Sequence, residues 1–280
     1  MADLDRNIAD APGYGATIPH AEAVIIDAGL RAYMLRIYNY MTLGLAITGA
    51  AALGIYLISV TDSLSNAAYV VRGPRVLAAS AGMVLQSRDI LLTSVGYTVF
   101  VGPLKWVFIL APVVLVLALG FGLGRLRPAT AQVLFWIYAA LVGLSLGSIF
   151  LVFTHTSIVR VFFITAASFG ALSVWGYTTR RDLTGIGAFL MMGVIGLLIA
   201  GLVNLFLQSS SLQWAVSVVG VLVFAGFTAW NTQQLKNEYL YGAMDGDTME
   251  RSAILGALSL YLNFINMFLY LLQLFGQREQ

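Results

Sequence analysis

The sequence predicts an all-α integral membrane protein. Of its 280 residues, 59% are hydrophobic and 10% are charged, whereas charged residues make up about 25% of a typical soluble domain. The apolar residues also collect into runs of roughly 20, the length at which a helix crosses the hydrocarbon core of a bilayer. The formal net charge of +2 is too small to indicate a nucleic-acid partner. The lipid bilayer is therefore the first partner that the sequence predicts.

Seven runs are long enough to form transmembrane helices. They cover approximately residues 38–60, 105–124, 130–153, 158–178, 183–207, 212–233 and 253–275. We expect a seven-helix membrane domain over residues 33–276, preceded by a flexible tail over residues 1–32 and followed by a short tail over residues 277–280. The first 32 residues are polar, contain scattered glycines and prolines, and lack the apolar core of a signal peptide.

The connection between the first two spans, residues 61–104, is much longer than the others. Its apolar stretch at residues 76–85 is short for a span and rich in alanine, serine and glycine. We expect this stretch to form an interfacial helix or a folded external lid. An eighth crossing is the alternative, and it would invert the orientation of every later span.

The short loops alternate between basic and uncharged, and cytoplasmic loops carry the excess of lysine and arginine. Residues 154–157 and 208–211 contain neither lysine nor arginine. Basic residues instead follow the second and fourth spans and flank the loop after the sixth: Arg125, Arg127, Arg180, Arg181, Lys236 and Arg251. The alternation predicts a cytoplasmic N-terminus and an external C-terminus. Four tryptophans near the predicted span ends are expected to be interfacial anchors: Trp106, Trp175, Trp214 and Trp230.

The residue types needed for catalysis or metal binding are missing at membrane depth. The chain has no cysteine, and its acidic residues lie in the tails and loops. Neither His20 nor His155 has a second histidine or a carboxylate at metal-ligand spacing. An intramembrane protease would need paired aspartates, a Ser–His pair or a zinc site within the spans. We therefore expect no enzyme activity, no metal site and no cofactor.

Two basic residues lie close to predicted span ends, Lys105 in the second span and Arg160 in the fourth. Long cationic side chains at such positions extend to the membrane surface, and we expect this of both. The alternative for Arg160 is a side chain that faces the bundle and hydrogen-bonds polar groups there.

The last two spans contain polar insertions. They read FTAWNTQQLK at residues 227–236 and LYLNFINMFL at residues 260–269, and they place Asn231, Asn263 and Asn266 inside apolar helices. A polar group at that depth is costly to bury without a partner, so a functional site is expected there. Because the loop between the two spans is short, the helices should be antiparallel neighbours with Asn231 and Asn263 facing each other.

Several phrases in combination resemble the Bax-inhibitor-one family, and they are most similar to its bacterial branch. They are RAYMLRIYNY at 31–40, PLKW at 103–106, FFITAA at 162–167, GYTT at 176–179 and the two closing phrases. The resemblance implies six helices around a central C-terminal helix, in the inner membrane of a bacterium. In that membrane the external C-terminus predicted from the loop charges is periplasmic. It also implies a pH-sensitive calcium leak gated by two aspartates that share a proton. This chain has Asn231 and Asn263 at those positions, and Lys105 is the sole basic residue in the span where the family has a latching arginine.

The asparagine pair changes the expected chemistry. Two adjacent carboxylates cannot easily both ionise, so such a pair senses pH near neutrality, whereas two carboxamides do not titrate. Calcium prefers six to eight oxygen ligands that include carboxylates, so a neutral pair should bind it weakly. Either a neutral, pH-insensitive seam is natural to this chain, or the sequence was altered at these two positions.

Two function classes remain open on the sequence. The first is a leak channel or transporter for calcium or another cation, with a path along the last helix past Asn231, Asn263 and Asn266. The second, also implied by the resemblance, is a non-conducting interaction protein that binds another membrane protein or modulates a membrane protease through its N-terminal tail.

Overall fold

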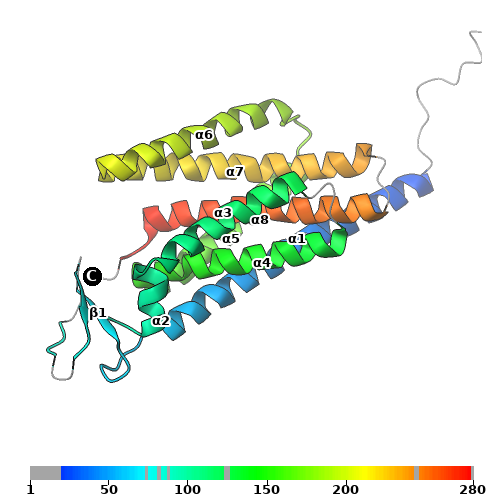
Figure 1. Cartoon of the computed structure of the whole chain (residues 1–280). Helices are drawn as coiled ribbons and strands as arrows, with labels where there is room; N and C mark the ends of the chain where they lie inside the picture. The colour runs from blue at the N-terminus through cyan, green and yellow to red at the C-terminus, as the bar shows by residue number, and fades with distance from the viewer. Residues whose placement is uncertain are drawn as a thin grey trace, which may run out of the picture.

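The chain forms a bundle of long helices with a small β-sheet at one end (Figure 1). The structure is a computed structural model, and it describes residues 20–72, 75–80, 83–86, 89–122, 127–242 and 246–278, without the side chains of residues 20–27 and 121–122. The long helices are α1 (His20–Ser59), α3 (Leu104–Gly122), α4 (Pro128–Leu146), α5 (His155–Thr178), α6 (Thr184–Leu207), α7 (Ser210–Tyr241) and α8 (Gly246–Phe275). A 3-10 turn, η3 (Gly147–Leu151), extends α4.

Six described helical segments are long and apolar enough to cross a membrane, and a bent pair makes a seventh. The bent pair joins the short α2 (Ser94–Gly96) and the π-helical turn η1 (Tyr97–Val101) to α3, with an angle of 55° between the two parts. The break falls at Gly102 and Pro103, and proline lacks the N–H that would continue the helical hydrogen bonding. The predicted all-α membrane protein with seven spans is confirmed, with the second span bent.

The C-terminal helix α8 is the centre of the bundle. In its most apolar window 67% of the residues are buried, against 17% for α6. It packs mainly against α1, α4, α5 and α7, while α3 packs on the outside of α4 and α6 on the outside of α7 (Figure 1). The predicted central helix is therefore confirmed, with two of the six surrounding helices standing in an outer layer.

A three-stranded antiparallel sheet occupies much of the long connection. Its strands are β1 (Tyr69–Arg72), β2 (Arg75–Ala78) and β3 (Ile90–Leu92), in the order β2-β1-β3. The described residues of the stretch 76–85 hold β2 and irregular chain, so the expected interfacial helix and the eighth crossing are both wrong there. The segment is folded, as the alternative of a folded external lid expects, and its external side stays a prediction. Hydrogen bonds from Thr93 N to Ser59 O (3.0 Å) and from Thr93 Oγ1 to Ile58 O (2.9 Å) tie the sheet to the end of α1.

An ion pair joins the end of β1 to the residue before β3. Arg72 donates from Nε to Asp89 Oδ1 at 2.8 Å and from Nη2 to Oδ2 at 2.6 Å, and the Asp89 side chain is 1% exposed. The Arg72 guanidinium, with a further hydrogen bond from the backbone N–H of Gln86, lowers the pKa of Asp89 to about 2. Paired hydrogen bonds of this kind are geometrically specific, so they fix β1 against the segment that precedes β3.

Helix α1 begins earlier than the sequence suggested. It starts at His20, so residues 20–32, expected in the flexible tail, are helical, and residues 1–19 lie outside the described part. No proline follows Pro19 until Pro74, which leaves the helix uninterrupted. Leu30 is buried, and Tyr33 OH lies 2.7 Å from Ser252 Oγ on α8. The Tyr33 ring also lies 5.3 Å from that of Tyr239 on α7. Packing against α7 and α8 accounts for the extra turns, because a helix end is stabilised mostly by packing.

Candidate functional site

Three of the predicted site residues line one cavity. A cavity of about 500 Å³ lies among α6, α7 and α8, and Asn231, Asn263 and Asn266 all contribute to its wall. We call it the amide cavity. Most of its other described lining residues are apolar or aromatic, so the three amides are its main polar groups.

The local sequence explains this convergence. Asn263 and Asn266 are three residues apart on α8, so they share a helix face. Helix α7, which carries Asn231, ends only a few residues before α8 begins and packs antiparallel to it. Asn263 is 5% exposed and its Nδ2 has no hydrogen-bond partner, while Asn266 Nδ2 donates to Leu262 O at 2.8 Å. No direct hydrogen bond between Asn231 and Asn263 is present among the described residues, so the two amides share a cavity without being bonded to each other.

Trp230 belongs to the same wall. Its Nε1 is buried without a hydrogen-bond partner, and a Cβ added at Gly187 of α6 would come within 2.5 Å of its ring. The close approach of α6 therefore covers part of the indole, and the position of Trp230 at the membrane surface stays a prediction. By contrast, Trp106 is 58% exposed and Trp214 is 63% exposed.

Polar residues continue beyond the cavity along one face of α8. Ser259, Asn263, Asn266, Tyr270 and Gln273 follow one another at alternating spacings of four and three residues, the repeat of a single helix face. The first four line the amide cavity. Of these five residues, only Asn263 and Asn266 were predicted from the sequence, although the spacing itself is a signal that identifies the other three.

An amide network closes the end of this face that is nearer the sheet. Gln273 Oε1 accepts hydrogen bonds from Gln213 Nε2 at 2.5 Å and from Ser217 Oγ at 2.8 Å, both on α7. Gln213 Oε1 in turn accepts from Asn204 Nδ2 of α6 at 2.9 Å. The polar face of α8 is thus continuous from the amide cavity to a partnered network that joins the same three helices.

The two basic residues proposed as supporting groups lie elsewhere. Lys105 is in the first turn of α3, with Nζ 5.5 Å from the centroid of the Trp106 ring, and Arg160 is exposed on α5. Neither lines the amide cavity. No lysine, arginine, histidine or carboxylate is among the described residues of its wall, and the described part of the chain has no group of three metal-ligating side chains.

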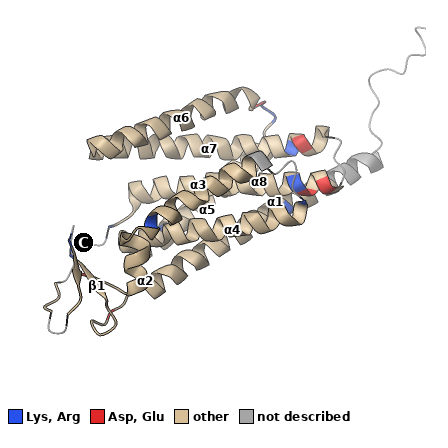
Figure 2. Ribbon diagram, in the orientation of Figure 1, with Lys and Arg blue, Asp and Glu red and all other residues tan. Residues whose placement is uncertain are grey.

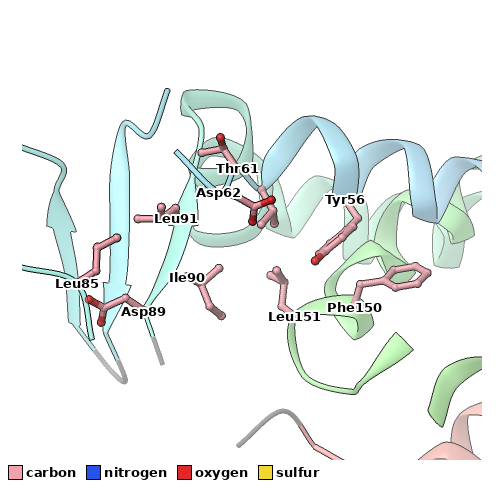
Figure 3. Close-up of a pocket in the computed structure, with 10 residues that line it drawn as sticks. Tyr56, Thr61, Asp62, Leu85, Asp89, Ile90, Leu91, Phe150 and Leu151 are labelled. Carbon is pink, nitrogen blue, oxygen red and sulfur yellow. The ribbon is translucent and has the colours of Figure 1, made fainter. Parts of the chain in front are cut away.

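A separate cavity of about 300 Å³ lies between the sheet and the ends of the helices (Figure 3). Tyr56 and Phe150 face it from α1 and η3, Asp62 lies three residues after the end of α1, and Asp89 lies directly before β3 (Figure 3). Because Asp89 is held by Arg72, only Asp62 offers an exposed carboxylate here. One such group is too few to hold a calcium ion.

Comparison with known proteins extends over nearly the whole chain. The model of a family described as inhibitor of apoptosis-promoting Bax1 matches residues 30–280. An uncharacterized protein of Caulobacter vibrioides is 43% identical over 281 residues, which is 100% of both chains. The inner membrane protein YbhL of Escherichia coli K12 is 40% identical over 264 residues, covering 93% of this chain and 98% of YbhL. An uncharacterized protein of Rickettsia prowazekii is 42% identical over 253 residues, covering 90% of this chain and 92% of that protein.

Proposed function

We propose that this chain, which belongs to the Bax-inhibitor-one family, is a calcium-permeable cation leak protein of the bacterial inner membrane. Its path follows the polar face of α8 through the amide cavity. The observation that carries the proposal is that Asn231, Asn263 and Asn266 line one open cavity of about 500 Å³ among the membrane-spanning helices α6, α7 and α8. Polar groups at this depth mark ion and substrate pathways in membrane proteins.

The absence of charge among the described wall residues sets the expected size of the leak and its affinity for calcium. Amide and hydroxyl oxygens can replace part of a cation's water shell, but without a carboxylate they hold calcium weakly. A weakly held ion leaves as readily as it enters, which conduction requires. We therefore expect a small leak and no tightly bound calcium.

The same wall makes the leak insensitive to pH. None of the described lining side chains ordinarily titrates between about pH 5 and 8. Two aspartates in place of Asn231 and Asn263 would form a coupled acid pair whose proton affinity falls in or near that range. We likewise propose that the role involves no catalysis, because the cavity wall offers no described nucleophile beside a base.

The orientation in this proposal has the N-terminus in the cytoplasm and the C-terminus in the periplasm. It is supported by the distribution of charge: most charged residues of the helices lie at the end of the bundle away from the sheet (Figure 2). Arg127, Arg180, Arg181 and Lys236 belong to chain segments that meet at this end, and cytoplasmic ends carry the excess of basic residues.

The test is calcium entry into dye-loaded liposomes that contain the purified protein, measured from pH 5 to 8. The parent should give a small entry rate that changes little with pH. Asn231→Asp with Asn263→Asp should give a rate that varies severalfold across the series, because the pair changes its protonation in that range.

Asn66→Asp is the matched control, since Asn66 is exposed in the connection before β1; it should behave as the parent does. A steep pH response in the parent would show that another group is the sensor. No entry with the parent or any variant would reject the leak and favour the non-conducting interaction protein.

A further inference from the structure

A second polar cavity lies at the end of the bundle away from the sheet. It has a volume of about 540 Å³ and is bounded by the turn between α5 and α6 and by the last turns of α7. Its wall includes three cations, Arg180, Arg181 and Lys236, and a single carboxylate, Asp182. We call it the basic cavity. None of its four charged residues lines the amide cavity.

Buried hydrogen bonds hold the turn in place. Gln233 of α7 is 5% exposed; its Oε1 accepts from Leu183 N and its Nε2 donates to Arg181 O, both at 2.8 Å. Almost one helical turn further along α7, Lys236 Nζ donates to Tyr177 O at 2.8 Å and lies 5.6 Å from the centroid of the Tyr177 ring. The backbone that carries the cations is therefore fixed before any ligand arrives, and such preorganisation lowers the cost of binding.

The positive charge of the basic cavity is not neutralised by the carboxylate. Among the described residues, Asp182 forms no ion pair with Arg180, Arg181 or Lys236. Asp182 instead accepts a hydrogen bond from Thr184 N at 2.9 Å at the start of α6. Hydrogen bonds from the side chain and backbone of Thr184 hold the pKa of Asp182 below its usual value.

The surroundings place the basic cavity at the level of lipid headgroups. Trp175, one turn before the end of α5, is 49% exposed, and Tyr241 at the end of α7 is 85% exposed and lines the cavity. Exposed tryptophan and tyrosine at the ends of membrane helices sit at the membrane–water interface. Leu240, which also lines the cavity, is 40% exposed and offers an apolar contact beside the cations.

We propose that the basic cavity binds the phosphate of an anionic phospholipid headgroup. Guanidinium groups match phosphate oxygens with paired hydrogen bonds, and a lysine adds a point charge. Basic pockets between membrane helices at the cytoplasmic side are the recognised setting for such headgroups. The proposal concerns charge and position at the interface, so it does not depend on whether the protein conducts ions.

The test measures stabilisation by lipid in neutral detergent. The thermal unfolding midpoint of the full chain is followed while phosphatidylglycerol is added, with phosphatidylcholine and inorganic phosphate as separate arms. Phosphatidylglycerol should raise the midpoint to a plateau. The concentration that gives half of this rise should increase about fivefold in Arg180→Gln or Arg181→Gln and about 25-fold in the double variant, since each interfacial cation contributes about that factor to anionic lipid binding.

Arg75→Gln is the control, because Arg75 is an exposed arginine on β2 and outside the basic cavity; its titration should match the parent. The single variants remove exposed side chains, so their midpoints without lipid should also match the parent. An unchanged lipid titration in the double variant would overturn the proposal. Equal stabilisation by phosphatidylcholine would show that the headgroup need not be anionic and would overturn that part of the proposal. Equal stabilisation by inorganic phosphate would show that the cavity binds free phosphate and not a lipid.

Discussion

The two sides of α8 differ in how completely their polar groups are partnered. Toward α1 and α4, Tyr261 OH lies 2.7 Å from Thr48 Oγ1, and Thr48 in turn donates to Ala139 O at 2.9 Å, so three helices share one short chain of hydrogen bonds. Toward α6 and α7, Asn263 Nδ2 and Trp230 Nε1 are buried without partners beside the amide cavity. The hydrogen bonds on the first side join α8 to α1 and α4, whereas the two buried groups on the second side make none among the described residues.

The outer helices reinforce this difference. The largest buried apolar cluster surrounds α8 with side chains of α1, α4 and α5, whereas a second cluster of five buried residues lies between α6 and α7. Helix α6 packs mainly on α7 alone. A helix with one main neighbour can shift with the loss of fewer contacts, so movement that opens the amide cavity should involve α6 before α1 or α4.

The largest effect is expected from Tyr261→Ala, on the partnered side. Tyr261 is fully buried, and its ring lies edge-on to Phe135 and Tyr138 with centroids 5.7 and 5.8 Å away. Removing the ring should lower the free energy of unfolding by about 3–5 kcal/mol, measured by thermal or denaturant unfolding in detergent. Tyr261→Phe keeps the ring and should lose only about 1 kcal/mol. Equal losses in both variants would assign the stability to the hydroxyl and not to packing.

An intermediate effect is expected from Gln233→Leu. This substitution leaves Leu183 N and Arg181 O without their buried partner, and an unpaired buried group costs about 1–3 kcal/mol. We expect a loss of about 2 kcal/mol in the same unfolding measurement. Gln234→Leu, at the next position of α7, has no such bonds among the described residues and should change stability by less than about 0.5 kcal/mol. A similar loss at both positions would show that the bonds of Gln233 do not stabilise the turn.

The smallest effect is expected from Asn263→Leu, although Asn263 is as buried as Gln233. Its Nδ2 already lacks a partner, so replacing the amide by an apolar side chain of similar size should leave the unfolding free energy unchanged or raise it by about 1 kcal/mol. A loss of more than about 2 kcal/mol would indicate that the amide has an acceptor in the cavity, and the contrast between the two sides of α8 would then fail.

Much of the fold was predictable because the membrane imposes one simple requirement, a long apolar run for each crossing. The sheet was not, since its strands have only four, four and three residues and its geometry depends on Arg72 meeting Asp89 across the turn. The early start of α1 was not predicted for a related reason: the turn around Tyr33 packs against Ser252 of α8 and Tyr239 of α7, which local composition does not show.

The candidate site was predictable only in part. The three-residue spacing of Asn263 and Asn266 was enough to place them on one face of α8. The small number of residues between the last two spans was enough to predict that Asn231 lies near them. The rotation of each helix about its axis is set by tertiary contacts, however. The sequence therefore did not show that Gly187 of α6 lies against the Trp230 ring. It also did not decide whether Arg160 points into the bundle or away from it.

The attachment of the sheet to α1 affects how freely this connection can change. A helix leaves its last carbonyl groups without partners inside the helix, and in α1 Thr93 supplies donors to two of them, at Ile58 and Ser59. The residue that follows β3 thus serves as the terminal cap of a helix more than thirty positions earlier. A shorter or grafted linker would remove those donors along with the sheet. The long connection is therefore a structural part of the first span, and a transplant of that span into another protein would need to carry the connection with it.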